Sequence, residues 1–145
     1  MNRKVNQRGF TLIELVVVIT ILGILAAFAV PRFTRMEAQA RAATVQALGG
    51  SLRSSAALTH ALWLASGQPA TVTVEGSAVA ITMVNGYPNR ATIDDTISDL
   101  TGFNNYTGNG VFQKTGAPNS CRVTYNQAPA NGAPTLTFGS NPLVC

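Results

Sequence analysis

The sequence predicts an α+β fold in which a long N-terminal α-helix, hydrophobic in its first half, packs on a small antiparallel β-sheet domain. Three observations support this prediction. A run of about twenty nearly uninterrupted apolar residues follows Gly9 and ends at Pro31. Apolar residues then recur at helical spacing as far as Trp63. The rest of the chain contains short segments of alternating polarity, separated by turn-forming residues.

The run from Phe10 to Val30 has no polar face. A helix that is apolar all round must be buried in lipid or among other helices. At 1.5 Å per residue this run spans roughly 30 Å, which is enough to cross the hydrocarbon core of a bilayer. We therefore expect residues 10–31 to form a transmembrane helix, or the core of a helical assembly.

Glu14 is the one carboxylate in this run. A charged residue in a transmembrane helix costs about 2.5 to 3.5 kcal/mol at the bilayer centre and less near the end, so Glu14 needs a partner. Two interpretations are open. Thr11 and Glu14 have the spacing of a capping box, in which each side chain bonds the other's backbone N–H. Alternatively, Glu14 pairs with a positive charge.

Residues 1–9 form a basic leader that contains Arg3, Lys4 and Arg8. This leader is not an ordinary secretory signal, because the apolar run is too long and residues 30–33 lack a small-residue cleavage site. Gly9 is the small residue in a cleavable position. Cutting after it would keep the apolar run and create an α-amino group, protonated at neutral pH, about one helical turn from Glu14.

The segment from Gly9 to Glu14, Gly-Phe-Thr-Leu-Ile-Glu, resembles the processing motif of type IV prepilins. The resemblance implies that a membrane-embedded prepilin peptidase cleaves after Gly9 and methylates the new N-terminal Phe10. It also implies that Glu14 serves filament assembly, and that Pro31 is the helix-bending proline. The helix between Gly23 and Pro31 is then expected to bend or loosen in the filament.

Shorter segments further along the chain are similar to pilins of the mannose-sensitive haemagglutinin type. They are Arg41 to Leu64, Gly86-Tyr87-Pro88, Cys121 to Tyr125, and the terminal Cys145. This resemblance implies a major pilin that polymerises with itself into a surface filament used for attachment. It implies a precursor in the bacterial inner membrane, with a cytoplasmic leader and a periplasmic C-terminal domain. The expected further partner is a pilus assembly machinery driven by a cytoplasmic ATPase.

Residues 32–66 are predicted to form the amphipathic second half of the helix. The expected apolar positions are Phe33, Met36, Ala40, Ala43, Ala47, Leu48, Leu52, Ala56, Leu58, Leu62 and Trp63. Gly and Pro within Ser66 to Pro69 are expected to end the helix.

Residues 67–145 are predicted to form a strand-rich globular domain. We expect a hairpin from residues 71–74 and 78–84, a turn at 85–88, and a short helix after Thr92. Residues 103–120 are rich in Asn, Gly and Thr and are predicted to be a loop. Two more strands are expected at 121–125 and 135–138.

Cys121 and Cys145 are the two cysteines of the chain, and they lack the spacing of a metal site. A disulfide is the expected state in an oxidising compartment. It would close a loop of about 25 residues, 121–145, and contribute on the order of 3.5 kcal/mol by the chain-entropy estimate.

Neither the charge balance nor the remaining polar residues indicate a cofactor, a metal or catalysis. Three of the ten basic residues lie in the leader, so no nucleic-acid partner is expected. His60 has no nucleophile arranged around it and is expected to be a packed or surface residue. Asp94, Asp95 and Asp99 do not match the ligand spacing of a calcium loop. We therefore predict a structural protein rather than an enzyme.

Three alternatives to the pilus subunit stay open. A pseudopilin of a type II secretion system would share all the N-terminal features. A DNA-uptake pilin would need exposed basic residues on the sheet, where the sequence offers Arg90, Lys114 and Arg122. A single-pass anchored periplasmic binding domain would keep its leader.

Overall fold

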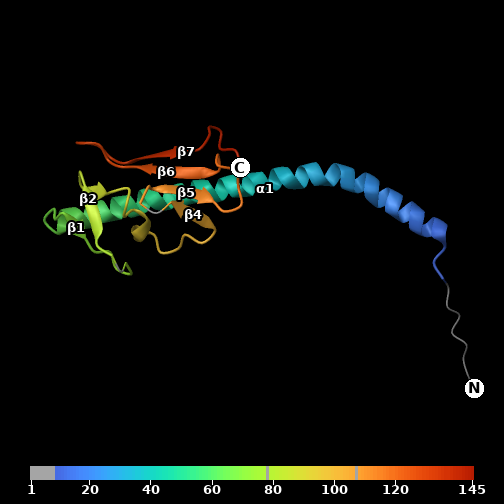
Figure 1. Cartoon of the computed structure of the whole chain (residues 1–145), viewed down its shortest axis with the longest axis horizontal. Coiled ribbons are helices and arrows are strands. Elements are labelled where there is room, and N and C mark those ends of the chain that lie inside the picture. Colours follow the sequence, from blue (N-terminus) through green and yellow to red (C-terminus); the bar gives the residue numbers. More distant parts are fainter. Residues whose placement is uncertain (1–8, 78, 107) are drawn as a thin grey trace, which may run out of the picture. The chain divides into compact units, whose positions relative to one another are not determined.

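The structure is a computed structural model, and it describes residues 9–77, 79–106 and 108–145. In this part of the chain one long helix is followed by seven short strands and one 3-10 helix (Figure 1). The basic leader residues Arg3, Lys4 and Arg8 lie outside the described residues. The chain divides into two compact units, the first ending at Glu37 and the second running from Ala38 to Cys145. The predicted α+β class is confirmed.

Helix α1 spans Leu12–Ala65 and contains 54 residues. It ends where the sequence predicts. Gly67 and Gln68 take positive φ angles of 80° and 63°, and the Gln68 N–H donates to the carbonyl oxygen of Trp63 at 2.9 Å. A glycine in the left-handed region followed by such a backward hydrogen bond is the usual way to close a helix, because it satisfies carbonyls in the last turn.

The second unit is built around a four-stranded antiparallel sheet whose strands follow one another in sequence order. They are β4 (Phe103–Tyr106), β5 (Val111–Lys114), β6 (Arg122–Asn126) and β7 (Thr135–Phe138). In Figure 1 this sheet runs along the C-terminal half of α1. Phe112 pairs with Val123, which pairs with Phe138, so these side chains share one face.

This inner face of the sheet and the helix share one hydrophobic core. The helix contributes Val45, Leu48, Leu52 and Ala56, and the rest of the unit contributes Ile93, Phe112, Cys121, Val123 and Tyr125. Spacings of three and four residues place the helix side chains on one face, as the sequence predicts for 48, 52 and 56.

A smaller sheet of three strands precedes the larger one, with β1 (Thr71–Val72), β2 (Ile81–Val84) and β3 (Tyr87–Pro88). The predicted hairpin is confirmed, although its strands are shorter than expected. Asn85 and Gly86, at φ 54° and 83°, form the turn between β2 and β3. The Tyr125 hydroxyl donates to the carbonyl oxygen of Pro88 at 2.8 Å and so links the two sheets. Burial, with a smaller contribution from nearby Tyr87, raises the pKa of Tyr125 well above its ordinary value.

Two predictions for the second unit are wrong. The segment 103–120 is not a continuous loop, because it contains strands β4 and β5. The helix expected after Thr92 is a 3-10 helix of three residues, Asp94–Thr96, and the next residue, Ile97, is already extended. Strand pairing explains the first error. Strand β4 pairs with β5, and β5 pairs with β6, so tertiary context overrides the loop-like composition of this segment.

The predicted apolar stripe of the helix is only partly correct. Val45, which was not on the predicted stripe, is fully buried, whereas Leu58 is 72% exposed and Ala43 and Ala47 are also exposed. Thr59 is buried in place of Leu58, and its hydroxyl donates to the Ser55 carbonyl at 2.8 Å. Buried hydroxyls are tolerated in a helix when they bond a carbonyl one turn earlier.

The disulfide between Cys121 and Cys145 is present, with an S–S distance of 1.98 Å. Two further contacts hold the C-terminal tail. The Ser120 hydroxyl donates to the Val144 carbonyl oxygen at 2.8 Å. Gly139 passes so close to Ser120 that a Cβ on Gly139 would lie 2.3 Å from the Ser120 carbonyl oxygen. The tail therefore needs glycine at position 139.

Candidate functional site

The Gly9-Phe10 step lies ahead of the helix in an exposed, non-helical stretch. The backbone is irregular from Gly9 to Thr11, and α1 begins at Leu12. The Phe10 side chain is 85% exposed, and a Cβ on Gly9 would meet no atom within 4 Å. A peptidase binds its substrate in an extended form, so a peptide bond that lies outside the helix, as the Gly9–Phe10 bond does, is accessible to cleavage. The geometry around Gly9 is compatible with cleavage at this bond.

Thr11 and Glu14 form a complete capping box at the start of α1. The Thr11 backbone N–H donates to Glu14 Oε2 at 2.9 Å, and the Glu14 N–H donates to Thr11 Oγ1 at 3.4 Å. The Thr11 hydroxyl also donates to Glu14 Oε2, at 2.7 Å. A carboxylate in the first turn of a helix interacts favourably with the helix dipole. The capping interpretation of Glu14 is therefore correct for the uncleaved chain.

The same geometry leaves the second role of Glu14 available. All three hydrogen bonds to Thr11 use Oε2 or the backbone N–H of Glu14. Glu14 itself is exposed. A carboxylate accepts several hydrogen bonds on its two oxygens, so a capped Glu14 can still receive an ammonium group. Its pairing with another subunit stays a prediction.

The apolar first part of α1 has no partner within its own unit. Every large hydrophobic residue from Leu12 to Met36 is between 45% and 79% exposed. By length and composition α1 can cross a membrane, since its most apolar window of 18 residues has a mean hydropathy of 2.8 and no buried residue. So large an unpartnered apolar surface marks a site of contact with lipid or protein.

The two residues expected to bend the helix both lie inside α1. The helix continues through Pro31, and the Thr34 hydroxyl donates to the Pro31 carbonyl oxygen at 3.1 Å. A Cβ on Gly23 would meet nothing within 4 Å. Gly23 therefore has no packing role within its own unit. The loosening of the helix between Gly23 and Pro31 stays a prediction.

The N-terminal residues match a known family of segments. Residues 4–30 match the prokaryotic N-terminal methylation motif. The chain is 51% identical over 53 residues to the type IV narrow pilus major component PilA5 of Thermus thermophilus, covering 37% of this chain and 46% of that protein. It is 43% identical over 52 residues to a type IV major fimbrial protein FimA of Dichelobacter nodosus, covering 36% and 33%.

The matched part of this chain is similar to type IV pilins. The similarity to these relatives covers about a third of this chain and less than half of their length. No solved structure matches the chain. The matched region contains Gly9, Phe10 and Glu14, so the residues selected from the sequence lie where the family motif lies.

His60 lies in an aromatic cluster between the helix and the β2–β3 turn of the second unit. Its ring stacks on Tyr87, with ring centroids 4.2 Å apart and planes 7° apart, and it also lies near Trp63. His60 Nδ1 is 2.6 Å from the Gly86 carbonyl oxygen, and the Trp63 indole N–H donates to Pro69. His60 is thus a packed residue, as expected. Glycine at position 86 leaves space for both rings, because a Cβ there would lie 2.9 Å from Trp63 and 3.1 Å from His60.

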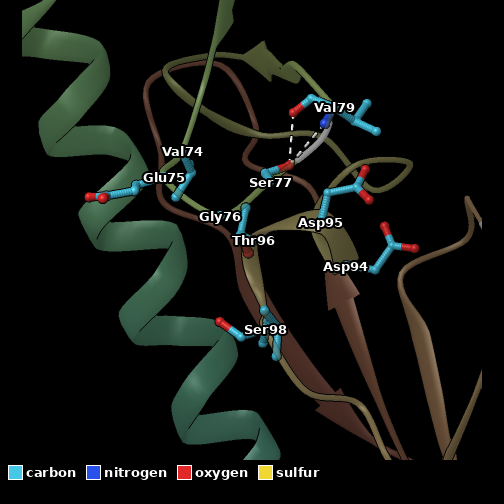
Figure 2. Close-up of a pocket in the computed structure, with 10 residues that line it drawn as sticks. Val74, Glu75, Gly76, Ser77, Val79, Asp94, Asp95, Thr96 and Ser98 are labelled. Carbon is cyan, nitrogen blue, oxygen red and sulfur yellow. Dashed lines mark hydrogen bonds between the residues drawn. The ribbon is translucent and has the colours of Figure 1, made fainter.

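Three of the four acidic residues of the second unit line a polar pocket of about 290 Å³ (Figure 2). Asp94 and Asp95 approach it from the 3-10 helix, and Glu75 from the β1–β2 loop. Burial, together with the neighbouring charge of Asp94, raises the pKa of Asp95. Asp99 instead accepts a hydrogen bond from the Thr101 N–H at 2.7 Å. Among the described residues no three His, Cys, Asp or Glu side chains gather as metal ligands.

Two of the three basic residues considered for nucleic-acid binding are engaged within the second unit. The Arg90 guanidinium donates to the Asn109 carbonyl oxygen through Nε at 3.1 Å and Nη2 at 2.7 Å. The Lys114 ammonium lies 4.9 Å from the centroid of the Phe103 ring. No sequence pattern predicts the Arg90 contact, because it joins residues 19 positions apart through a loop.

Proposed function

We propose that this chain is a structural subunit, and specifically a major pilin, of a type IV pilus used for attachment to surfaces or cells. The observation that carries the proposal is the Gly9-Phe10 junction followed by the apolar run 10–31, whose one carboxylate, Glu14, lies in the first turn of α1. The two relatives support it, since their names describe them as pilus or fimbrial proteins. They favour the pilus over the secretion pseudopilin.

Cleavage after Gly9 would change the chemistry of this end of the helix. It releases an α-amino group on Phe10, which is positive at neutral pH, close to the capped Glu14. Between staggered subunits, each amine can meet the Glu14 of its neighbour. Such a pair neutralises both charges in an apolar surrounding and fixes the register of one subunit on the next.

The apolar surface of α1 supports a membrane-bound precursor that later assembles. Moving residues 12–30 from lipid into a bundle of similar helices exchanges one apolar surrounding for another, so the hydrophobic gain is small. Assembly then needs an energy source, which the proposed machinery with its cytoplasmic ATPase supplies. The precursor would sit in the inner membrane with its leader cytoplasmic and its C-terminal domain periplasmic. The assembled pilus would be extracellular.

The mass of the mature N-terminus tests this proposal most directly. We expect intact-mass and peptide analysis of filaments from the native cell to show cleavage after Gly9 and one methyl group on Phe10. A chain that keeps residues 1–9 would instead be a single-pass anchored protein. Filaments found only on overexpression would indicate a secretion pseudopilin.

A Glu14→Gln variant tests the role of the carboxylate. We expect normal membrane insertion, normal leader removal and no filaments, because the amide cannot neutralise the neighbouring amine. The matched control is Glu75→Gln, which removes an exposed carboxylate of the second unit. Electron microscopy of sheared filaments and immunoblots of the membrane fraction measure the two outcomes. Normal filaments from Glu14→Gln would refute the register mechanism, though not the pilin assignment.

A further inference from the structure

The second unit contains three Asn-Gly steps, at 85–86, 109–110 and 131–132. Asn followed by Gly can rearrange without any enzyme, because the glycine backbone nitrogen can attack the amide carbon of the asparagine side chain. Glycine favours this ring closure because it has no Cβ to hinder the approach. The surroundings of each step decide whether it reacts.

Arg90 contacts the peptide group of the second step. Its Nε and Nη2 donate to the Asn109 carbonyl oxygen at 3.1 and 2.7 Å. That oxygen belongs to the same peptide group as the Gly110 nitrogen. Gly110 lies close to the Arg90 backbone as well, since a Cβ at this position would be 3.5 Å from the Arg90 carbonyl oxygen. The fold therefore holds the Arg90 guanidinium next to the Asn109–Gly110 peptide bond.

This contact favours the reactive form of the Gly110 nitrogen. The nitrogen attacks after losing its proton, and the resulting negative charge is shared with the Asn109 carbonyl oxygen. Arginine stays charged at all relevant pH values. A hydrogen bond from a cation becomes stronger as negative charge develops on the acceptor, which is the way that an oxyanion hole lowers a barrier.

We propose that Asn109 is a site of self-modification, deamidated through a succinimide whose formation Arg90 promotes. The Gly110 nitrogen loses its proton to hydroxide and bonds to the Asn109 side-chain Cγ, and ammonia leaves. Water then adds to one of the two ring carbonyls and opens the ring. The product is aspartate or isoaspartate, and no oxidant, reductant or cofactor takes part.

The other two Asn-Gly steps are restrained in ways that oppose the reaction. The Asn85 side chain donates to the Ala128 carbonyl oxygen at 2.9 Å, which holds its amide away from the backbone. In the third step the attacking nitrogen itself, that of Gly132, donates to the Pro129 carbonyl oxygen at 3.1 Å. We therefore expect position 109 to react first.

The two products should affect the fold differently. Aspartate keeps the backbone and places a carboxylate beside Arg90. Isoaspartate adds one carbon to the main chain just before Gly110, whose carbonyl oxygen accepts from the Tyr125 N–H at 2.7 Å. That hydrogen bond lies where the pairing of β5 with β6 begins, so isoaspartate should loosen this end of the sheet.

The test is to age the full-length chain in detergent at mildly alkaline pH and to follow the amide-to-acid mass change in peptides. Wild type is compared with Arg90→Gln and Arg90→Lys, and with Arg122→Gln as a control for loss of an exposed arginine. We expect Arg90→Gln to slow deamidation at Asn109 about tenfold, and Arg90→Lys to be intermediate because lysine lacks the planar fork. Arg122→Gln should match wild type.

Circular dichroism, and the same ageing in concentrated urea, separate this effect from misfolding. In urea all four chains should deamidate at one rate, because the Arg90 contact is gone. Two results would overturn the proposal. One is a deamidation rate at Asn109 in folded Arg90→Gln that equals or exceeds the wild-type rate. The other is deamidation at Asn85 or Asn131 that is faster than at Asn109 in folded wild type.

Discussion

The apolar side chains of helix α1 are exposed in its first part, from Leu12 to Met36, and packed in a core in its second part, from Val45 to Ala56. From Leu12 to Met36 every large hydrophobic residue is exposed within its own unit. From Val45 to Ala56 the helix buries one face against the four-stranded sheet. The second part thus belongs to a core that the chain supplies itself. The first part needs lipid or another molecule, because no exposed helix in water stays apolar all round.

The sharpest test of this difference replaces a leucine in each part. Leu52 is fully buried, whereas Leu22 is 58% exposed. We expect Leu52→Ala to lower the free energy of unfolding of the second unit by about 2 to 5 kcal/mol, the usual cost of a cavity in a core. Leu22→Ala should leave it unchanged. Urea unfolding in detergent, followed by Trp63 fluorescence, measures both. Equal losses would show that the two parts fold as one unit.

The second prediction concerns the cap of the first part. Thr11→Val removes the hydroxyl that Glu14 and its N–H use, and we expect the first turn of α1 to lose about 0.5 to 2 kcal/mol. Thr11→Ser is the control, because it keeps the hydroxyl. Hydrogen exchange at the first-turn amides in detergent should be faster only in Thr11→Val. Faster exchange throughout the second unit would contradict the independence of the two parts.

The sequence predicts the helix well because its signals are local. The apolar run, the Thr11 to Glu14 spacing and the glycine at position 67 each act within one or two turns of the chain. The strands β4 and β5 were missed for the opposite reason. The segment around them is rich in Asn, Gly and Thr. What makes them strands is the pairing of β4 with β5 and of β5 with β6, together with the burial of Phe112.

The same distinction applies to the candidate sites. Gly9, Phe10 and Glu14 can be predicted as site residues because the motif that contains them is defined by spacing along the sequence. The Thr11 bonds to Glu14 were one of two alternatives, and composition alone could not choose between them. The Arg90 contact with Asn109 depends on how two loops approach each other, so only the structure reveals it.

Two adjacent glycines allow a finer test within the second part of the helix. A Cβ on Gly50 would meet nothing within 4 Å, whereas one on Gly49 would lie 3.1 Å from the Phe138 ring. We expect Gly50→Ala to stabilise the second unit by about 0.5 to 1 kcal/mol through helix propensity. Gly49→Ala should gain nothing, because Phe138 must move. Thermal unfolding compares the two, and equal gains would show that Phe138 adapts freely.

The smallest expected effects come from two aspartates of the second unit, with opposite signs. Hydrogen bonds from the side chain and backbone of Thr101 lower the pKa of Asp99. Its charged form therefore stabilises the fold above its unfolded pKa of about 3.8, and this contribution is lost as pH falls through the lower, folded value. Asp99→Asn should slightly lower the melting temperature at neutral pH and have no effect in strong acid.

Asp95 should behave in the opposite way, because burial and the charge of Asp94 raise its pKa in the folded state. The folded chain then holds the proton more tightly, so stability falls as pH rises from the unfolded pKa through the raised one. Asp95→Asn should raise the melting temperature at neutral pH and leave it unchanged in acid. Because the penalty arises within the second unit, the gain should be the same in a Glu14→Gln background. A gain that depended on Glu14 would mean that the charges of the two units are coupled.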